Sequence, residues 1–529
     1  MLKIDQLKVN IDNETTDLTI AISKKLRIGV NDINSYKVLK RSIDARKKQE
    51  IYFVFSVLAN VKNESNFLQK KIPNVEIYNK VEEEFIDKSL KYDKTKKIAI
   101  IGFGPAGMFS ALRFADANIK VTVFERGEAV DDRTETINRF RNRGILNPES
   151  NVQFGEGGAG TFSDGKLTNR SKDIRGKYLF EHFVKAGAPE EIMYVHNPHI
   201  GTDKLVEVVR NIRKEVESKG SVVNFNSKVT NITKNSKKIV LTVNDAKEEF
   251  DYVILATGHS ARDTIEMLYN NDIEVVQKPF AVGFRIEHHQ TMINKAQFGV
   301  NYKHKKLGAA EYKLTHQTNK NRGVYTFCMC PGGVVMPASS ELGLLAVNGM
   351  SEYKRSKVNA NSALLVNVNE SDFLSDHPLA GIAYQREIEK KAFELGGSDY
   401  KAPVQTVKDF LDNKPTTKLG SVMPSYSIGV KYANLRSIYS ESINEAFVEA
   451  FTKLGNKLKG FNSDDALLTG IESRSSSPVR ILRDKETLES TNLTNFYPTG
   501  EGAGYAGGIV SAGIDGIKVA ESILNKIKK

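Results

Sequence analysis

The strongest chemical signal in this sequence is a glycine-rich turn followed by an acidic residue. Residues 97–127 read KIAIIGFGPAGMFSALRFADANIKVTVFERG, which predicts an apolar strand, a turn, a helix and a second strand. In that order Gly102 takes the tight turn, Gly104 lets the backbone approach a pyrophosphate, and Gly107 lets the helix pack on the strand. Glu125 falls where it would bind a ribose hydroxyl. The segment predicts a dinucleotide-binding cradle.

Two further glycine-rich segments indicate which dinucleotide is bound. Residues 154–167 read FGEGGAGTFSDGKL, and this density of glycine marks backbone that turns sharply or lies against a flat ring. Residues 495–523 again predict strand, glycine-rich turn and helix, and unpaired N–H groups near Gly507 would face an electron-rich atom. A nicotinamide dehydrogenase needs no such second turn, whereas the flavin end of FAD does. Glu125 is compatible with both NAD and FAD, so the later segments favour FAD.

A bound flavin does most of the chemistry itself, so few catalytic residues are needed. His259 follows an ATG at the end of a predicted strand, where doubly wound sheets bind ligands. His288 is a candidate substrate-site acid or a hydrogen-bonded structural residue. Arg474 would bind an acidic substrate or a reduced flavin, or form a structural ion pair. Cys328 and Cys330, two positions apart, are more typical of small buried hydrophobes than of a redox pair.

Composition and charge exclude several classes of protein. A chain of 529 residues is too long for one core, and its two cysteines exclude a disulfide scaffold and indicate a reducing compartment. The segment MLKIDQLKVN has no apolar signal region and no run reaches membrane-span length, so we expect a cytoplasmic protein. We expect no metal site. The formal charge of +12 favours a solvated surface and leaves nucleic-acid binding open.

The predicted fold class is α/β. We expect a Rossmann-like FAD-binding domain, built from a parallel sheet and a β-meander, with an inserted α+β substrate domain and a small N-terminal α+β domain. The N-terminal domain would span residues 1–91 and the inserted substrate or cap domain residues 272–469, and the FAD-binding domain would be formed by two separate segments, residues 97–271 and 470–529. Residues 81–97 would form a charged linker. The predicted meander uses residues 222–230, 238–243 and 249–255.

Four segments in this order resemble a known family. They are GFGPAG with FERG, GEGGAGTFSDGKL, DYVILATGHS and YPTGEGAGYAGGI. Together they resemble flavoproteins with a glutathione-reductase-type FAD domain and, more narrowly, a bacterial family of uncharacterised FAD-dependent dehydrogenases. The resemblance covers most of the chain, including RSIDARKK, KPFAVGFRIEH and FCMCPGG. It implies a fold and a cofactor, FAD, but no substrate.

The resemblance also implies which residues bind FAD. The pyrophosphate loop and the adenosine-ribose clamp would be Gly102, Gly104, Pro105, Ala106, Gly107, Glu125 and Arg126. The adenine contact and the end of the ATG strand would be Val229, Thr257 and Gly258. The loop along the isoalloxazine would contribute Gly158, Gly160, Ser163, Asp164 and Lys166. The ribityl chain and the pyrimidine side would contact Gly500, Glu501, Gly504, Tyr505, Ala506, Gly507 and Gly508.

The leading functional hypothesis is an FAD-dependent oxidoreductase that transfers a hydride between flavin and an unidentified small organic substrate. No second GxGxxG follows the ATG, so a dedicated NAD(P)H domain is not expected. NAD(P)H would then be a transient reductant docked on the insert, or the substrate itself. One alternative is a flavoprotein that acts on or binds RNA, suggested by 20 basic and 14 acidic side chains in residues 1–97. The other alternative is a non-catalytic, flavin-binding redox sensor. The sequence does not indicate an oligomeric state.

Overall fold

Five short parallel strands form the sheet on which the site is built. In the computed structural model they lie in the order β23-β11-β5-β6-β7. The structure describes residues 1–13, 17–64, 67, 72–79, 90–168, 173–235 and 237–529, so residues 81–89 of the predicted linker lie outside the described residues. In sheet order the strands are Phe496–Pro498, Tyr252–Leu255, Ile98–Ile101, Thr122–Phe124 and Val222–Asn224.

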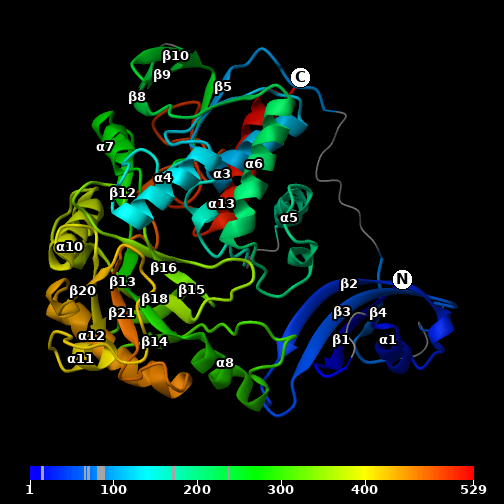
Figure 1. The fold of residues 1–529 in the computed structure, drawn as a ribbon. Coiled ribbons are helices and arrows are strands. Elements are labelled where there is room, and N and C mark those ends of the chain that lie inside the picture. The colour runs from blue at the N-terminus through cyan, green and yellow to red at the C-terminus, as the bar shows by residue number, and fades with distance from the viewer. Residues whose placement is uncertain (14–16, 65–66, 68–71, 80–89, 169–172, 236) are drawn as a thin grey trace.

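The alternation of side chains along these strands gives the sheet two apolar faces. Ile98 and Ile100 of β5 belong to a buried cluster formed with helices, while Ala99 and Ile101 belong to a second cluster formed with the meander. The helices of the first cluster are α3 (Pro105–Asp116), α5 (Arg175–Lys185), α6 (Thr202–Ser218) and α13 (Ile509–Lys526). Figure 1 shows α3, α6 and α13 close together beside β5. The α/β fold class with a Rossmann-like domain is confirmed.

The predicted meander is present, but two of its segments were wrongly bounded. Its strands, in the order β10-β9-β8, are Ala246–Phe250, Ile239–Val243 and Val229–Lys234. Residues 222–224 and 252–255, which the prediction placed in the meander, belong instead to the parallel sheet as β7 and β11. Asn226 has φ of 51°, a left-handed conformation that separates β7 from β8. Each of the two predicted strands therefore contains a turn between two layers.

A seven-stranded sheet lies between β12 (Val275–Gln277) and β22 (Val479–Ile481) in the chain, and residues 280–472, which contain it, are called the insert below. Its order is β14-β15-β18-β13-β21-β19-β20, and every pair except β19 with β20 is antiparallel. In sheet order the strands are Thr315–Gln317, Gly323–Cys330, Asn359–Val368, Phe280–His289, Leu467–Glu472, Ala402–Thr406 and Val430–Tyr432. Its helices are α8 (Gln290–Phe298), α9 (Glu370–Phe373), α10 (Ala380–Gly396), α11 (Val407–Leu411) and α12 (Glu441–Lys457).

Several elements lie where the insert meets the parallel sheet. They are helices α4 (Val130–Arg143) and α7 (Arg262–Asn270), the paired strands β12 (Val275–Gln277) and β22 (Val479–Ile481), and the hairpin of β16 (Val334–Pro337) and β17 (Val347–Met350). The chain enters the insert just after β12 and leaves it just before β22. Because β12 and β22 pair with each other, the two crossings lie side by side. This places the end of the seven-stranded sheet against the carboxyl ends of the parallel strands.

The N-terminal residues form a separate antiparallel sheet. Its order is β2-β3-β1-β4, with strands Ile33–Asp44, Tyr52–Val61, Leu2–Asn10 and Val75–Ile77. Helix α1 (Thr19–Leu26) packs on this sheet through Ile22 and Leu26. In Figure 1 the sheet lies beside α5 and α8, apart from the parallel sheet. Among the described residues, no helix has the length and apolar character needed to cross a membrane.

Candidate functional site

One large cavity lies where the carboxyl ends of the parallel strands face the insert. It is lined by the first glycine-rich turn, the 154–166 loop, the residues after β11 and the turn before α13. The insert contributes residues of β15, β17 and β21, among them Cys328, Asn348 and Glu472. Sequence segments up to about 400 residues apart therefore meet around one space, at the crevice where doubly wound sheets bind ligands.

The first glycine-rich turn forms one wall. Gly102 has φ of 97°, and Gly104 is the N-cap of α3, with Pro105 in its first turn. Gly104, Pro105 and Ala106 line the cavity, so the N-terminus of α3 faces it. Gly107 does not line it. A Cβ at Gly107 would lie 2.0 Å from the Gly102 carbonyl oxygen, so this glycine allows the close approach of helix and strand.

Glu125 and Arg126 lie at the end of β6. The Glu125 carboxylate accepts hydrogen bonds from the backbone N–H groups of Phe103, Gly127 and Gly155, at 2.8, 3.0 and 2.9 Å. It thereby connects two glycine-rich loops while it lines the cavity. The Arg126 guanidinium lies 4.2 Å from the Phe154 ring centre and is held by carboxylates of the neighbouring residues Glu149 and Asp263. Both predicted clamp residues are thus held in place by contacts within the protein.

The 154–166 loop forms the second wall. Gly158, Gly160, Ser163, Asp164 and Lys166 all line the cavity. A Cβ at Gly158, whose φ is 63°, would lie 3.1 Å from the Cα of Gly104, so the two glycine-rich segments touch. Asp164 accepts two hydrogen bonds from Arg355, at 3.0 and 2.5 Å. Lys166 forms an ion pair with Glu311 at 3.3 Å.

The residues after β11 and the turn before α13 form the third wall. Val229, Thr257, Gly258 and His259 line the cavity, as do Glu501, Gly507 and Gly508. The remaining predicted residues of that turn, which are Gly500, Gly504, Tyr505 and Ala506, do not line it. They support the turn instead: the Tyr505 hydroxyl donates to the Ile481 carbonyl at 3.0 Å, and its ring stacks on Arg483.

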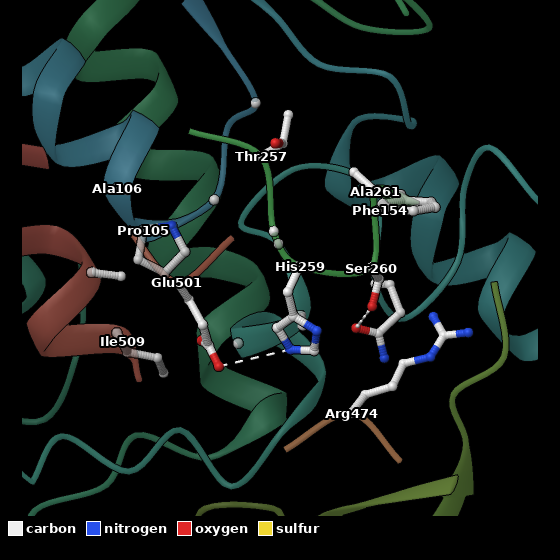
Figure 2. Close-up of a pocket in the computed structure, with 18 of the residues that line it drawn as sticks. Pro105, Ala106, Phe154, Thr257, His259, Ser260, Ala261, Arg474, Glu501 and Ile509 are labelled. Atoms are coloured by element: carbon white, nitrogen blue, oxygen red, sulfur yellow. Dashed lines mark hydrogen bonds and ion pairs between the residues drawn. The ribbon is translucent and has the colours of Figure 1, made fainter. Parts of the chain in front are cut away.

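His259 and Glu501 face each other across this wall (Figure 2). His259 Nε2 lies 3.7 Å from Glu501 Oε1. Burial, followed by the positive charges of Arg474 and Arg262, lowers the pKa of His259 to about 3. Burial raises the pKa of Glu501 to about 7, against the opposing charge of Lys278. At neutral pH the pair is a neutral imidazole beside a carboxyl group that is near its midpoint.

Arg474 is both a cavity residue and a member of a buried ion-pair network. It donates to both Glu389 oxygens at 3.0 Å, and Arg262 donates to the same carboxylate at 2.7 and 2.9 Å. Glu389 is fully buried. Figure 2 shows Arg474 near His259 and Ser260. Arg474 therefore forms a structural ion pair, which was one of its predicted roles. Because Arg474 also lines the cavity, its positive charge acts there as well.

The two cysteines lie at a β-bulge in β15. The register with β18 shifts between Phe327 and Cys330, and Cys328 takes φ of 41°. Both cysteines line the cavity. Cys328 is exposed to that space, yet the surrounding protein desolvates its thiol and raises the pKa to about 12. The buried Arg285 donates to the Cys328 carbonyl at 2.9 Å and approaches Glu472 at 3.3 Å.

His288 lies elsewhere. It is 1% exposed, does not line the cavity, and its Nε2 is 2.8 Å from the Phe461 carbonyl oxygen. Burial lowers the pKa of His288 to about 4, so the ring is neutral at physiological pH. The structure therefore does not bring His288 together with the other predicted catalytic candidates.

Comparison with known proteins identifies the family. An uncharacterized protein of Clostridium beijerinckii is 48% identical over 527 residues, which is 99% of each chain. Residues 279–475 match the model "FAD-dependent protein, C-terminal domain-like", and residues 96–282 match "Pyridine nucleotide-disulphide oxidoreductase". The chain belongs to a family of FAD-dependent proteins. Residues 1–60 of this FAD-dependent protein match a domain of unknown function, DUF8436.

Two solved structures show weak similarity to this chain. A flavoprotein/dehydrogenase from Cytophaga hutchinsonii is 12% identical with a TM-score of 0.36, and the match covers 82% of this chain and 77% of that one. A glycine oxidase from Geobacillus kaustophilus is 9% identical with a TM-score of 0.30, covering 82% and 94%. The assignment of FAD rests on the family and on the cavity rather than on these two structures.

The cavity fits FAD in a way that can be tested residue by residue. A Cβ built on Gly258, Gly507 or Gly508 meets no atom within 4 Å, so each of these backbones faces open space in the cavity wall. The N-terminus of α3 would hold the pyrophosphate of this FAD-dependent protein. His259 Nδ1 is buried without a hydrogen-bond partner in the described protein, which leaves one polar atom for a ligand.

Several cavity residues were missed by the sequence prediction. Among them are Gln153, Phe154, Ser260, Asn348, Gly349 and Glu472. Phe154 is the first residue of the second glycine-rich segment, Gln153 directly precedes it, and Ser260 follows His259, so proximity to a motif could have indicated them. Ser260 donates to Gln153 at 3.1 Å. The other three come from the insert strands β17 and β21, where no motif marked them.

Replacing Cys328 by serine is expected to leave FAD bound and turnover within about threefold of wild type, because a thiol with so high a pKa is a poor nucleophile. The measurement is the flavin content of the purified variant and its turnover with any substrate that reduces the wild type. Cys330→Ser, at a 2% exposed position, is the paired variant. Complete loss of turnover in Cys328→Ser with FAD retained would show that this thiol takes part in the reaction.

Proposed function

We propose that this protein is an FAD-dependent oxidoreductase that transfers a hydride between flavin and a small organic substrate held between the FAD-binding sheet and the insert. The observation that carries the proposal is the convergence of three glycine-rich segments and three insert strands on one cavity. Bound FAD supplies the two-electron chemistry. The chain supplies the binding site, the local charges and the exclusion of water.

The chain's own residues divide this work. The N-terminus of α3, with Gly104 and Gly158 beside it, would hold the pyrophosphate of FAD. The insert strands close the cavity on the opposite side, through Asn348 and Glu472. Arg474 and the buried Arg285 place positive charge near the cavity, which favours the binding or formation of an anion there.

Glu501 is the proposed proton-handling group. A carboxyl group with a pKa of about 7 exchanges protons readily at neutral pH, as a general acid or base must. His259 stays neutral, because burial and nearby arginines lower its pKa to about 3. Its unpaired Nδ1 is then available to donate a hydrogen bond to, or accept one from, a bound ligand. His259 orients the ligand, and Glu501 holds or releases the proton.

The experiment that tests the function is anaerobic reduction of the purified holoprotein. NADH, NADPH and a panel of small metabolites are added separately, and the loss of flavin colour is followed. Bleaching by a nicotinamide nucleotide identifies a reductase, and bleaching by one metabolite alone identifies a dehydrogenase for it. A protein that no compound bleaches, but that heparin retains with a steep salt dependence, would favour the RNA alternative. A protein that no compound bleaches and that heparin does not retain would favour the redox-sensor alternative.

Glu501→Gln is expected to change how stability depends on pH. The folded protein holds a proton on Glu501 up to about pH 7, while the unfolded chain loses it near 4.5. The folded state therefore binds more protons between these values, so this group makes the free energy of unfolding fall as pH rises from 4.5 to 7. Glu501→Gln lacks this loss. Between pH 4 and pH 8 the free energy of unfolding of the variant, minus that of wild type, is therefore expected to rise by up to about 3 kcal/mol.

The measurement is urea unfolding of FAD-free wild type and variant across this pH range. Glu486→Gln, at an exposed loop position, is the control and should follow wild type at every pH. A constant difference between Glu501→Gln and wild type from pH 4 to 8 would contradict the assignment of an elevated pKa to Glu501.

A further inference from the structure

A second cavity, which the proposed chemistry does not use, lies beside the first. Its volume is about 640 Å³, large enough for a small organic molecule. Its walls come from three distant regions of the chain: strand β2 of the N-terminal sheet, residues 191–199, and residues 297–311 after β13. In Figure 1 the end of the β2–β3 hairpin reaches toward α8, where these regions meet.

Hydrogen bonds to backbone carbonyl groups fix these walls to one another. The Arg41 N–H donates to the Tyr194 carbonyl at 2.7 Å, and the His196 N–H donates to the Arg41 carbonyl at 2.8 Å. Asn301 donates to the Lys48 carbonyl at 2.8 Å. Lys306 donates to carbonyl oxygens of residues 11 and 13 at 3.1 and 2.6 Å. The N-terminal sheet therefore completes a cavity that the rest of the chain leaves open.

The second cavity carries excess positive charge. Five of its lining residues are lysine or arginine and two are glutamate. The lining cations are Arg41, Arg46, Lys48, Lys306 and Arg355. Lys306 is held by neutral carbonyl groups, and no carboxylate within the described part of the chain pairs with it. The Arg41 guanidinium lies 3.7 Å from the Glu191 carboxylate. It also lies within cation–π distance of two aromatic rings. Arg46 is paired with Asp44 at 2.7 Å, and Arg355 with Asp164 at 2.5 Å. The positive charge that favours an anionic ligand therefore comes mainly from Lys48 and Lys306.

Two ion pairs join this cavity to the first one. Arg355 lines the second cavity, and its partner Asp164 lines the first. Glu311 lines the second cavity, and its partner Lys166 lines the first. The shared wall is thus made of charged side chains. An anionic oxygen that enters the second cavity can bind Arg355 while the pair with Asp164 is kept, because only Nε and Nη2 of the guanidinium bond to that carboxylate.

We propose that the second cavity binds the phosphate-bearing end of a small-molecule substrate or co-substrate, whose uncharged reactive end extends toward the FAD cavity. This rests on the proposed function, since it names the chemical class of the molecule that exchanges electrons with the flavin. Arginine contacts phosphate oxygens through two parallel N–H groups, and lysine contacts them through one compact ammonium charge. A phosphorylated metabolite and a nicotinamide dinucleotide share this chemistry.

Inorganic pyrophosphate is the first probe, titrated calorimetrically into the holoprotein. The double variant Arg41→Gln/Lys306→Gln is expected to weaken pyrophosphate binding about tenfold or more, and higher salt is expected to weaken binding to wild type. Lys24→Gln, which removes one exposed charge from α1 of the same N-terminal unit, is the control and should bind within about twofold of wild type. Equal affinity in wild type and the double variant, or no binding to wild type, would overturn the proposal.

Competition identifies the source of the phosphate. NADH, NADPH, a sugar phosphate and a short oligoribonucleotide are each tested for displacement of pyrophosphate. Displacement by one of the small molecules supports the proposal, and displacement by the oligoribonucleotide alone overturns it in favour of an RNA site. For a small molecule that also bleaches the flavin, the double variant should raise KM and leave kcat unchanged. Intact flavin reduction with no change in KM or in pyrophosphate binding would reject this site and leave the proposed function standing.

Discussion

Valine in place of Gly104 is expected to give a folded protein that is purified without yellow colour. Gly104 is the N-cap of α3, lines the cavity, and lies where a pyrophosphate would meet the helix N-terminus. The γ-methyl groups of valine extend beyond the Cβ position, which already lies 3.7 Å from the Cα of Gly158. We expect FAD affinity to fall about 100-fold or more, since the backbone can no longer approach the ligand. The measurement is flavin content and the dissociation constant for added FAD.

Two further variants separate ligand binding from folding. Gly104→Ala adds only a Cβ in ordinary van der Waals contact, so a smaller loss of affinity is expected. Gly258→Val fills the cavity from another wall, where a Cβ meets no atom within 4 Å, and should also give colourless protein. All three should show wild-type circular dichroism. Wild-type FAD content in both valine variants would contradict the placement of FAD in this cavity.

Glu389→Ala is expected to cause the largest loss of stability. The variant removes the fully buried carboxylate that Arg262 and Arg474 share. Arg262 keeps its ion pair with Glu341 at 2.9 Å, whereas the buried Arg474 loses its ion-pair partner. An unpaired buried charge costs about 3–5 kcal/mol when its partner is removed. The measurement is the free energy of unfolding of the variant and wild type in urea at neutral pH.

Glu387→Ala on the same helix is the matched control. Glu387 is 60% exposed and pairs with Lys391 one turn away, so its loss should cost less than about 0.5 kcal/mol. Glu389→Gln keeps the shape and one acceptor oxygen but removes the charge and the second acceptor, so its loss of stability should fall between those of the two alanine variants. A loss below about 1 kcal/mol in Glu389→Ala would mean that Arg262 and Arg474 find other partners.

The parallel sheet and its glycine-rich turns were predictable from sequence for a physical reason. Each turn needs glycine at a fixed place, as at Gly102 with its left-handed φ and at Gly107 beneath the Gly102 carbonyl. Such requirements are local, so the sequence records them directly. The same local reasoning erred in the meander, because a strand that changes layers at Asn226 keeps its β-like composition on both sides of the turn.

The insert side of the site was not predictable in the same way. Asn348, Gly349 and Glu472 reach the cavity only because β17 and β21 end against the parallel sheet, and that is decided by long-range pairing. Arg474 could be found from sequence, but its buried partner Glu389 lies 85 residues away on α10. Non-local contacts of this kind leave no local pattern in the residues that make them.

The order in which the walls of the cavity occur in the chain bears on how the protein acquires its cofactor in the cell. The first glycine-rich turn and β5 are made early in translation, whereas β23, Glu501 and the start of α13 are made about 400 residues later. β23 is also an edge strand of the parallel sheet, next to β11. While the insert is being synthesised, β11 therefore lacks its neighbour β23, and the cavity lacks the wall formed by the turn before α13. FAD can be retained only after β23 has docked on the sheet. A shortage of riboflavin should therefore affect the completed chain rather than its synthesis on the ribosome.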